Sequence, residues 1–272
     1  MRTLAEYTVG FLDVKIVFDD SEVSNNPGMN HISFELPAPD GYRIVGGGAR
    51  VEPVDPTIGA LLTAMYPSSD GSVWHGKSKD HSALCAHSLT LYAVCVKSQR
   101  GPISDRDYIV VENESGVESH PSISATIPEE FSMVGGGARS NYPGIIGQLL
   151  ISSYPSSSSQ WLAGSKDHSA SAPSTITSFA IGLRSSFLKD HGVKLLAPVS
   201  ASSVRASHPH ATLNFTGASL LSGGAKVDYS PIGNLLTASY PTGQTGWNVD
   251  AKDHSAVDPE IATAYAIAAT PL

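Results

Sequence analysis

The sequence contains one long segment three times, and this internal repeat restricts the folds that the chain can adopt. Self-similarity at a fixed period indicates an architecture built from repeated units. A glycine-rich motif occurs at 45–50, returns at 134–139 and returns again, slightly altered, at 221–226. The three tryptophans of the chain follow at the same spacing of about 87 residues, as Trp74, Trp161 and Trp247. They are therefore one position of the repeat seen three times.

Three units of about 87 residues fill the chain. Each opens on an aromatic strand signal, at Tyr7, Tyr92 and Phe179, and a fourth copy of that signal begins at Tyr265. We expect a single domain over 1–272, with repeats at 7–91, 92–178 and 179–264. The remaining segment, 265–272, is predicted to be a closing strand that lies with the N-terminal strand and removes exposed sheet edges.

Side chains within each unit alternate with a period of two, which is typical of β-strands. Bulky Tyr92, Val94 and Val96 alternate with small Ala93 and Cys95. Charged residues make up 15% of the chain, against about 25% in an average protein, so the polar faces of long amphipathic helices cannot be supplied. The sequence predicts an all-β fold.

Four strand signals recur in each unit: the glycine motif, a Leu-Leu pair, the tryptophan and the aromatic-alanine pattern. The order of residues 47–51, then 61–63, then Trp74 resembles a repeat of the vitelline-membrane-outer-layer-type β-prism proteins. The resemblance implies three Greek-key units about a pseudo-threefold axis. It also implies glycan binding, because the wider β-prism class includes many lectins. The alternative fold is a row of tandem small β-sandwiches.

Charge and composition narrow the range of partners. Seventeen basic and 25 acidic residues give a net charge of −8, which disfavours binding to nucleic acid or to anionic membranes. No apolar run is long enough to span a membrane as a helix. Cys85 and Cys95 do not indicate a disulfide scaffold. The first residues lack the apolar region of a secretory signal, so we expect a soluble chain whose compartment stays open.

A Lys-Asp-His tripeptide recurs five residues after each tryptophan and is the most chemically versatile part of the repeat. Its copies are Lys79, Asp80 and His81; Lys166, Asp167 and His168; and Lys252, Asp253 and His254. In a ligand site, Asp would accept from hydroxyl groups while Lys and His donate. In a structural turn, Asp would cap the backbone and Lys would form an ion pair. A metal site would need the in-register His31, His120 and His208 to join from another strand, and we predict no metal and no cofactor.

The repeated tryptophans also have two interpretations. Trp74, Trp161 and Trp247 are either exposed stacking platforms for a sugar or the large core residue of each unit. Along an extended strand, Trp and Asp six residues apart share one face, whereas Lys and His lie on the other. We include the tryptophans with Lys-Asp-His as candidate ligand-binding residues, on condition that a turn brings them together.

The repeated glycines are expected to be structural. Glycine in a strand marks a bulge, a positive φ or close packing beneath a large side chain, and the repeated Trp or Tyr would be that side chain. A phosphate-binding loop is not indicated, because neither the following Lys-Ser/Thr nor a helix is present.

The sequence therefore predicts a non-enzymatic, lectin-like protein that binds carbohydrate or a cell surface through up to three equivalent sites. The alternatives are a receptor-binding or insecticidal bacterial toxin component and, ranked last, a glycan hydrolase. A hydrolase needs paired carboxylates, and the acidic residues in register are limited to Asp80, Asp167 and Asp253. Glycans or a cell-surface receptor are the expected partners, and homo-oligomerisation stays open.

Overall fold

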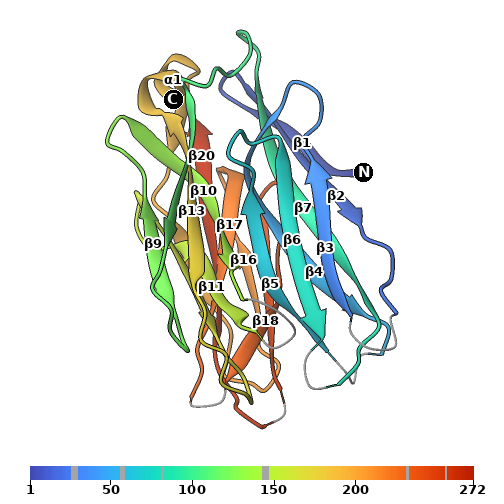
Figure 1. The fold of residues 1–272 in the computed structure, drawn as a ribbon. Coiled ribbons are helices and arrows are strands. Elements are labelled where there is room, and N and C mark those ends of the chain that lie inside the picture. Colours follow the sequence, from blue (N-terminus) through green and yellow to red (C-terminus); the bar gives the residue numbers. More distant parts are fainter. Residues whose placement is uncertain (26–29, 56–58, 81–82, 143–146, 231–232, 255) are drawn as a thin grey trace.

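A computed structural model describes residues 1–25, 30–55, 59–80, 83–142, 147–230, 233–254 and 256–272. Strands make up most of the described chain, and α1 (Ser185–Asp190) is the one short helix in it, so the all-β prediction is confirmed. The strands run along the length of the molecule, and α1 lies at the same end as the C-terminus (Figure 1). Among the described residues, no helix is long and apolar enough to cross a membrane.

The strands form three sheets. The first sheet contains, in order, β1 (Arg2–Val9), β2 (Leu12–Asp20), β7 (His87–Ser98), β4 (Arg43–Pro53), β18 (Asn234–Gly243), β19 (Gly246–Asp253) and β16 (His210–Asn214). The second contains β3 (His31–Pro37), β6 (Val73–Asp80), β5 (Ala60–Pro67), β10 (Phe131–Ser140), β13 (Ile176–Arg184) and β8 (Tyr108–Glu114). The third contains β14 (Val193–Leu195), β20 (Ala262–Pro271), β17 (Ser219–Val227), β11 (Leu149–Pro155), β12 (Gln160–Lys166) and β9 (Ser122–Thr126), and β15 (Val199–Ser202) also pairs with β20.

Each sheet repeats the same order of strand types. A glycine strand (β4, β10, β17) lies between an aromatic strand (β7, β13, β20) and a leucine strand (β18, β5, β11), and then come a tryptophan strand (β19, β6, β12) and an edge strand (β16, β3, β9). In chain order, each repeat begins at its edge strand and ends at its aromatic strand, as β3 to β7 do. Its glycine and aromatic strands lie in one sheet, and its other three strands lie in another. The three repeats are therefore interlocked through shared sheets.

The C-terminal segment differs from the prediction. Residues 265–272 were expected to close on the N-terminal strand. Instead, β20 is the aromatic strand of the third sheet, and β1 lies at the edge of the first sheet. A hydrogen bond from the Tyr7 hydroxyl to the Leu220 carbonyl, 2.6 Å long, joins β1 to the third sheet. The reason is that β17 needs β20 as its own partner, as β4 needs β7.

The consecutive glycines of each glycine strand meet three different neighbours. The first position (Gly46, Gly135, Ser222) lies where the three glycine strands meet, since a methyl group on Gly46 or Gly135 would overlap the Ser222 side chain. The second position (Gly47, Gly136, Gly223) leaves room for a tryptophan ring, because an added carbon would lie 2.6, 2.4 or 2.2 Å from Trp74, Trp161 or Trp247. The prediction of close packing beneath the tryptophan is confirmed.

The third glycine of each strand (Gly48, Gly137, Gly224) approaches the backbone of the adjacent leucine strand. An added carbon there would lie 2.0 Å from the Ser239 carbonyl oxygen, 2.5 Å from that of Met65 or 2.4 Å from that of Ser153. None of these three glycines has a positive φ, so backbone proximity, and not a left-handed conformation, excludes a side chain.

Candidate functional site

The lysines of Lys-Asp-His lie at the junctions between repeats. Lys79 and Lys166 are almost fully buried. The Lys79 ammonium donates to the Gly147 carbonyl at 3.3 Å and lies 4.9 Å from the centre of the Tyr142 ring. The Lys166 ammonium lies 5.2 Å from the centre of the Tyr229 ring. Each of these two lysines thus contacts a tyrosine of the following repeat, and the contact is of cation–π type.

Burial changes the protonation of these lysines. It lowers the pKa of Lys79 to about 8, partly opposed by the charge of Asp80. It also lowers the pKa of Lys166, opposed by Asp167 and Asp258. Taking an ammonium out of water disfavours its charged form. Keeping these two lysines charged is therefore unfavourable, and neighbouring carboxylates partly offset the penalty.

We expect the free energy of unfolding to rise by about 1 to 2 kcal/mol between pH 7.5 and pH 9.5 because of Lys79. Its pKa is about 8 in the folded chain, against the ordinary lysine value of 10.5. The unfolded chain therefore binds more protons in this range, and stability increases with pH. Below pH 7.5 both states are protonated and the effect vanishes. Urea unfolding of the parent and of Lys79→Met across this range measures it, and equal pH slopes for the two proteins would contradict it.

The aspartates hold the loops that follow the tryptophan strands. In each repeat one carboxylate oxygen accepts the backbone N–H of the residue five positions later, at Cys85, Ala172 or Asp258. The other oxygen faces the in-register histidine of the segment that enters the edge strand, across 3.7 Å for His31–Asp80, 3.1 Å for His120–Asp167 and 3.4 Å for His208–Asp253. This is the turn-capping arrangement, and it already uses both oxygens of each carboxylate.

Two histidines of the tripeptide, His168 and His254, contact each other. The Nε2 atom of His168 lies 2.6 Å from the His254 carbonyl oxygen, and the two rings are 5.5 Å apart. His81 lies outside the described residues. Within the described ranges, no group of three or more His, Cys, Asp or Glu side chains is placed to hold a metal ion.

The tryptophans are core residues, so the second of their two interpretations is confirmed and the exposed stacking platform is wrong. Trp74, Trp161 and Trp247 are at most 1% exposed. Their indole N–H groups donate inside the protein, to the Gly48 carbonyl and to the Ser153 and Ser239 hydroxyls. β6 and β19 run without a turn from the tryptophan to the aspartate, and β12 runs to the preceding lysine. The condition for joining Trp to Lys-Asp-His is therefore not met.

A different set of repeated side chains gathers on the outer face of each sheet. In each sheet, two aromatic rings stack across the third glycine, and we call each such pair an aromatic row. The rows are Tyr92 with Tyr240, Tyr66 with Phe179, and Tyr154 with Tyr265, with ring centres 5.3, 4.9 and 4.5 Å apart. Register explains the stacking, because the third glycine pairs directly with the aromatic strand residue and leaves space for both rings to cover it.

A cation flanks each aromatic row. Arg50, Arg139 and Lys226 come two residues after the third glycine, and residues two apart in a strand share a face. The Arg50 guanidinium lies 5.5 Å from the Tyr240 ring centre, and that of Arg139 lies 5.2 Å from the Tyr66 ring centre. A hydrogen bond to Asp228 is the main cause of the raised pKa of Lys226, and the neighbouring Tyr154 and Tyr265 contribute.

An oxygen acceptor completes each row. Glu52, Asn141 and Asp228 lie two residues beyond the cation and bind it at 2.9, 2.9 and 2.8 Å. The side chains of Arg50 and Lys226 are each 42% exposed. Each sheet therefore places two stacked rings, a donor and an acceptor close together. The solvent-accessible ring is Tyr240 in the first sheet and Tyr66 in the second, since Tyr92 and Phe179 are buried beneath them, and the third sheet has two partly exposed rings, Tyr154 and Tyr265.

Neither the row tyrosines, each of which precedes a proline, nor the cations beside them are among the ligand-binding residues expected from the sequence. The signal was present, because Arg50, Arg139 and Lys226 recur with the glycines at the spacing of the repeat. The sequence does not show which strand lies beside each glycine strand. Tyr240 reaches the first glycine strand from the third repeat, about 190 residues away in sequence.

Known proteins suggest no function for these side chains. The chain matches no protein-family model and no curated protein.

Proposed function

We propose that this chain is a non-enzymatic, lectin-like binding protein of the β-prism type, with three repeats about a pseudo-threefold axis. In this proposal the aromatic rows, and not Lys-Asp-His, are the binding sites. The observation that carries it is the recurrence of one group of side chains in all three sheets, namely two stacked rings with a donor and an acceptor. At least one tyrosine of each row is partly exposed, at Tyr66, Tyr154 and Tyr240.

The chemistry of an aromatic row suits a carbohydrate. An aromatic ring offers a flat apolar face, against which the C–H groups of a sugar ring can pack. Arginine and lysine donate hydrogen bonds, and carboxylate or amide oxygens accept them, so the hydroxyl groups at the edge of the sugar find both kinds of partner. Apolar surface with a few placed polar groups is the usual composition of a ligand site.

Three rows on three sheets favour a multivalent ligand. The rows lie in three separate sheets, so each row is treated as a site of its own. Several sites on one chain raise the apparent affinity for a surface that displays many glycans. We therefore propose a glycan-bearing surface as the partner.

Removing one ring from each row should abolish glycan binding without unfolding the protein. The variant is Tyr66→Thr, Tyr154→Thr and Tyr240→Thr combined, because these tyrosines are only partly buried and threonine retains a good strand propensity. The parent is screened against a glycan array, and each hit is tested with the variant. We expect the signal to fall at least about 10-fold.

The matched control is Phe11→Thr. Phe11 is 42% exposed and lies under the Arg100 guanidinium at 3.6 Å, so it is an accessible ring beside a cation but outside the rows. Its loss should leave glycan binding unchanged. Binding that survives in the triple variant, or that fails equally in Phe11→Thr, would contradict the proposal.

A further inference from the structure

The three junctions between repeats are not equivalent, and the difference lies at one position. Five residues after the third glycine, the second and third repeats have Tyr142 and Tyr229, whereas the first has Pro53. Tyr142 and Tyr229 lie over Lys79 and Lys166. Within the described part of the chain, these cation–π contacts have no counterpart at Lys252, the lysine that faces Pro53.

The junction at Tyr229 shows what this place in the fold accommodates. The Tyr229 ring lies 5.2 Å from the Lys166 ammonium on one side. On the other side its centre is 5.6 Å from that of the His120 ring, in an edge-to-face contact, and its hydroxyl lies 3.4 Å from His120 Nδ1. A lysine and a histidine thus enclose one phenol ring, and both are positions that recur in every repeat.

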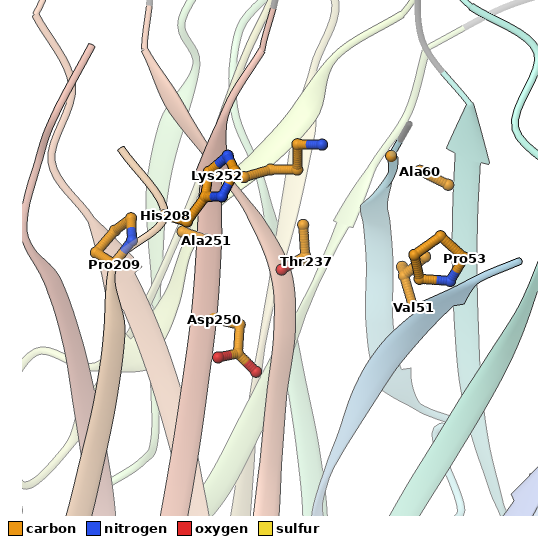
Figure 2. Close-up of a pocket in the computed structure, with 10 residues that line it drawn as sticks. Val51, Pro53, Ala60, His208, Pro209, Thr237, Asp250, Ala251 and Lys252 are labelled. Carbon is orange, nitrogen blue, oxygen red and sulfur yellow. The ribbon is translucent and has the colours of Figure 1, made fainter. Parts of the chain in front are cut away.

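A pocket occupies the corresponding place at the third junction. Its volume is about 220 Å³, and its lining includes Pro53, His208, Thr237, Asp250 and Lys252. Lys252 and His208 correspond by register to Lys166 and His120. Figure 2 shows the Lys252 side chain extending from the His208 side of the pocket toward Ala60, with Pro53 and Val51 on the opposite wall.

The size and charge of the pocket restrict its ligand. A cavity of about 150 Å³ accepts benzene, so a single substituted ring fits. The lining carries both a cation, Lys252, and a carboxylate, Asp250, and Asp250 is itself held by His210 at 2.5 Å. A neutral ring with a polar tip therefore suits the site better than an ion of either sign. The His208 side chain is 68% exposed, which leaves the pocket accessible from solvent.

We propose that this pocket binds the ring of a neutral phenol, with its face toward Lys252 and its hydroxyl toward His208. The chain's own Tyr229 makes the equivalent contacts one junction away. The same ring chemistry occurs in a free phenolic compound and in a tyrosine side chain of a partner protein. The proposal is independent of glycan binding by the aromatic rows.

The test uses p-cresol, titrated into the ¹⁵N-labelled full chain and followed by NMR. We expect one saturable site with shifts around Lys252 and His208. 4-Methylcyclohexanol, which has a similar shape without a π-system, should bind about 2- to 5-fold more weakly, because it cannot form the cation–π contact with Lys252. N-acetyl-tyrosine amide distinguishes the sources, since tighter binding than that of p-cresol indicates a peptide ligand and weaker binding a small phenol.

Two variants make the test specific. Pro53→Tyr supplies the missing ring from the chain itself and should weaken p-cresol binding at least 10-fold with the melting temperature retained or raised. Tyr229→Ala should open a second pocket and give two p-cresol sites per chain. If Pro53→Tyr does not fold, Lys252→Met replaces it, with an expected 3- to 10-fold loss. Absence of p-cresol binding to the parent, or equal binding to parent and variant, would overturn the proposal.

Discussion

Gly48→Ala is expected to lower the free energy of unfolding by about 3 kcal/mol or more, even though it adds a single carbon. That carbon would lie 2.0 Å from the Ser239 carbonyl oxygen and 2.9 Å from the Tyr240 Cα atom. Both atoms belong to the backbone of β18, so no side-chain rotation relieves the overlap, and the first sheet has to open between its two repeats. Overpacking usually costs about 1–3 kcal/mol and more where the backbone has to move.

Gly116→Ala is the matched control. A carbon added at Gly116 has no neighbour within 4 Å, and its φ is not positive, so its effect should stay within about 0.5 kcal/mol. Chemical denaturation of the two variants and the parent gives the comparison. If Gly48→Ala unfolds like Gly116→Ala, the close approach of the two repeats at β4 and β18 is wrong.

Trp161→Ala is expected to cost about 3–5 kcal/mol, the range for removal of a buried aromatic side chain. The ring is 1% exposed and packs on Gly136, which has no side chain to move into the space left behind. The Ser153 hydroxyl would also lose the indole N–H that it accepts at 3.0 Å. Trp74→Ala and Trp247→Ala should behave alike, because all three rings occupy the same place in the repeat.

Val204→Ala serves as the control for Trp161→Ala, since Val204 is 83% exposed and its truncation should change stability by less than about 0.5 kcal/mol. Thermal and urea unfolding are the measurements. The opposite pattern, in which Trp161→Ala melts like the parent but loses a ligand, would restore the interpretation of the tryptophans as a binding platform.

Much of the local structure could be predicted from the sequence, because the repeat reports each feature three times. The period of two predicts the strands. The glycine motif and the tryptophan recur at a constant spacing, which indicates that glycine and tryptophan pack together. The all-β class follows from the scarcity of charged residues. These are properties of single segments, so they can be read from the local sequence.

The pairing of repeats could not be predicted in this way. Three similar units do not reveal whether Tyr240 stacks on its own repeat or on another, and in the structure its partner is Tyr92 of the first repeat. Counted from edge strand to aromatic strand, Tyr92 lies on the last strand of the first repeat and β20 is the last strand of the third, although the aromatic signals also look like the start of each unit. For this reason, β20 could be taken for a leftover closing strand. Similarity among the repeats shows what recurs but not which copy is the neighbour.

The candidate binding site differs from the one expected from the sequence, because residue type is a weak guide to exposure. Lys-Asp-His has the side chains of a polar site, yet Lys79 and Lys166 are buried and Asp80 caps a loop. Tyrosine and arginine near a Gly-Gly pair resemble ordinary strand residues until the sheet places them on one outer face. The pocket beside Pro53 is likewise visible in the sequence only as the single departure from Tyr142 and Tyr229.

The number of glycan sites per chain tests the central proposal most directly. Titration calorimetry with a glycan from the array screen is run on the parent and on Tyr66→Thr, Tyr154→Thr and Tyr240→Thr separately. We expect more than one site on the parent and the loss of one site with each substitution, at unchanged melting temperature. A stoichiometry of one that none of the three substitutions alters would contradict repeated binding by the aromatic rows.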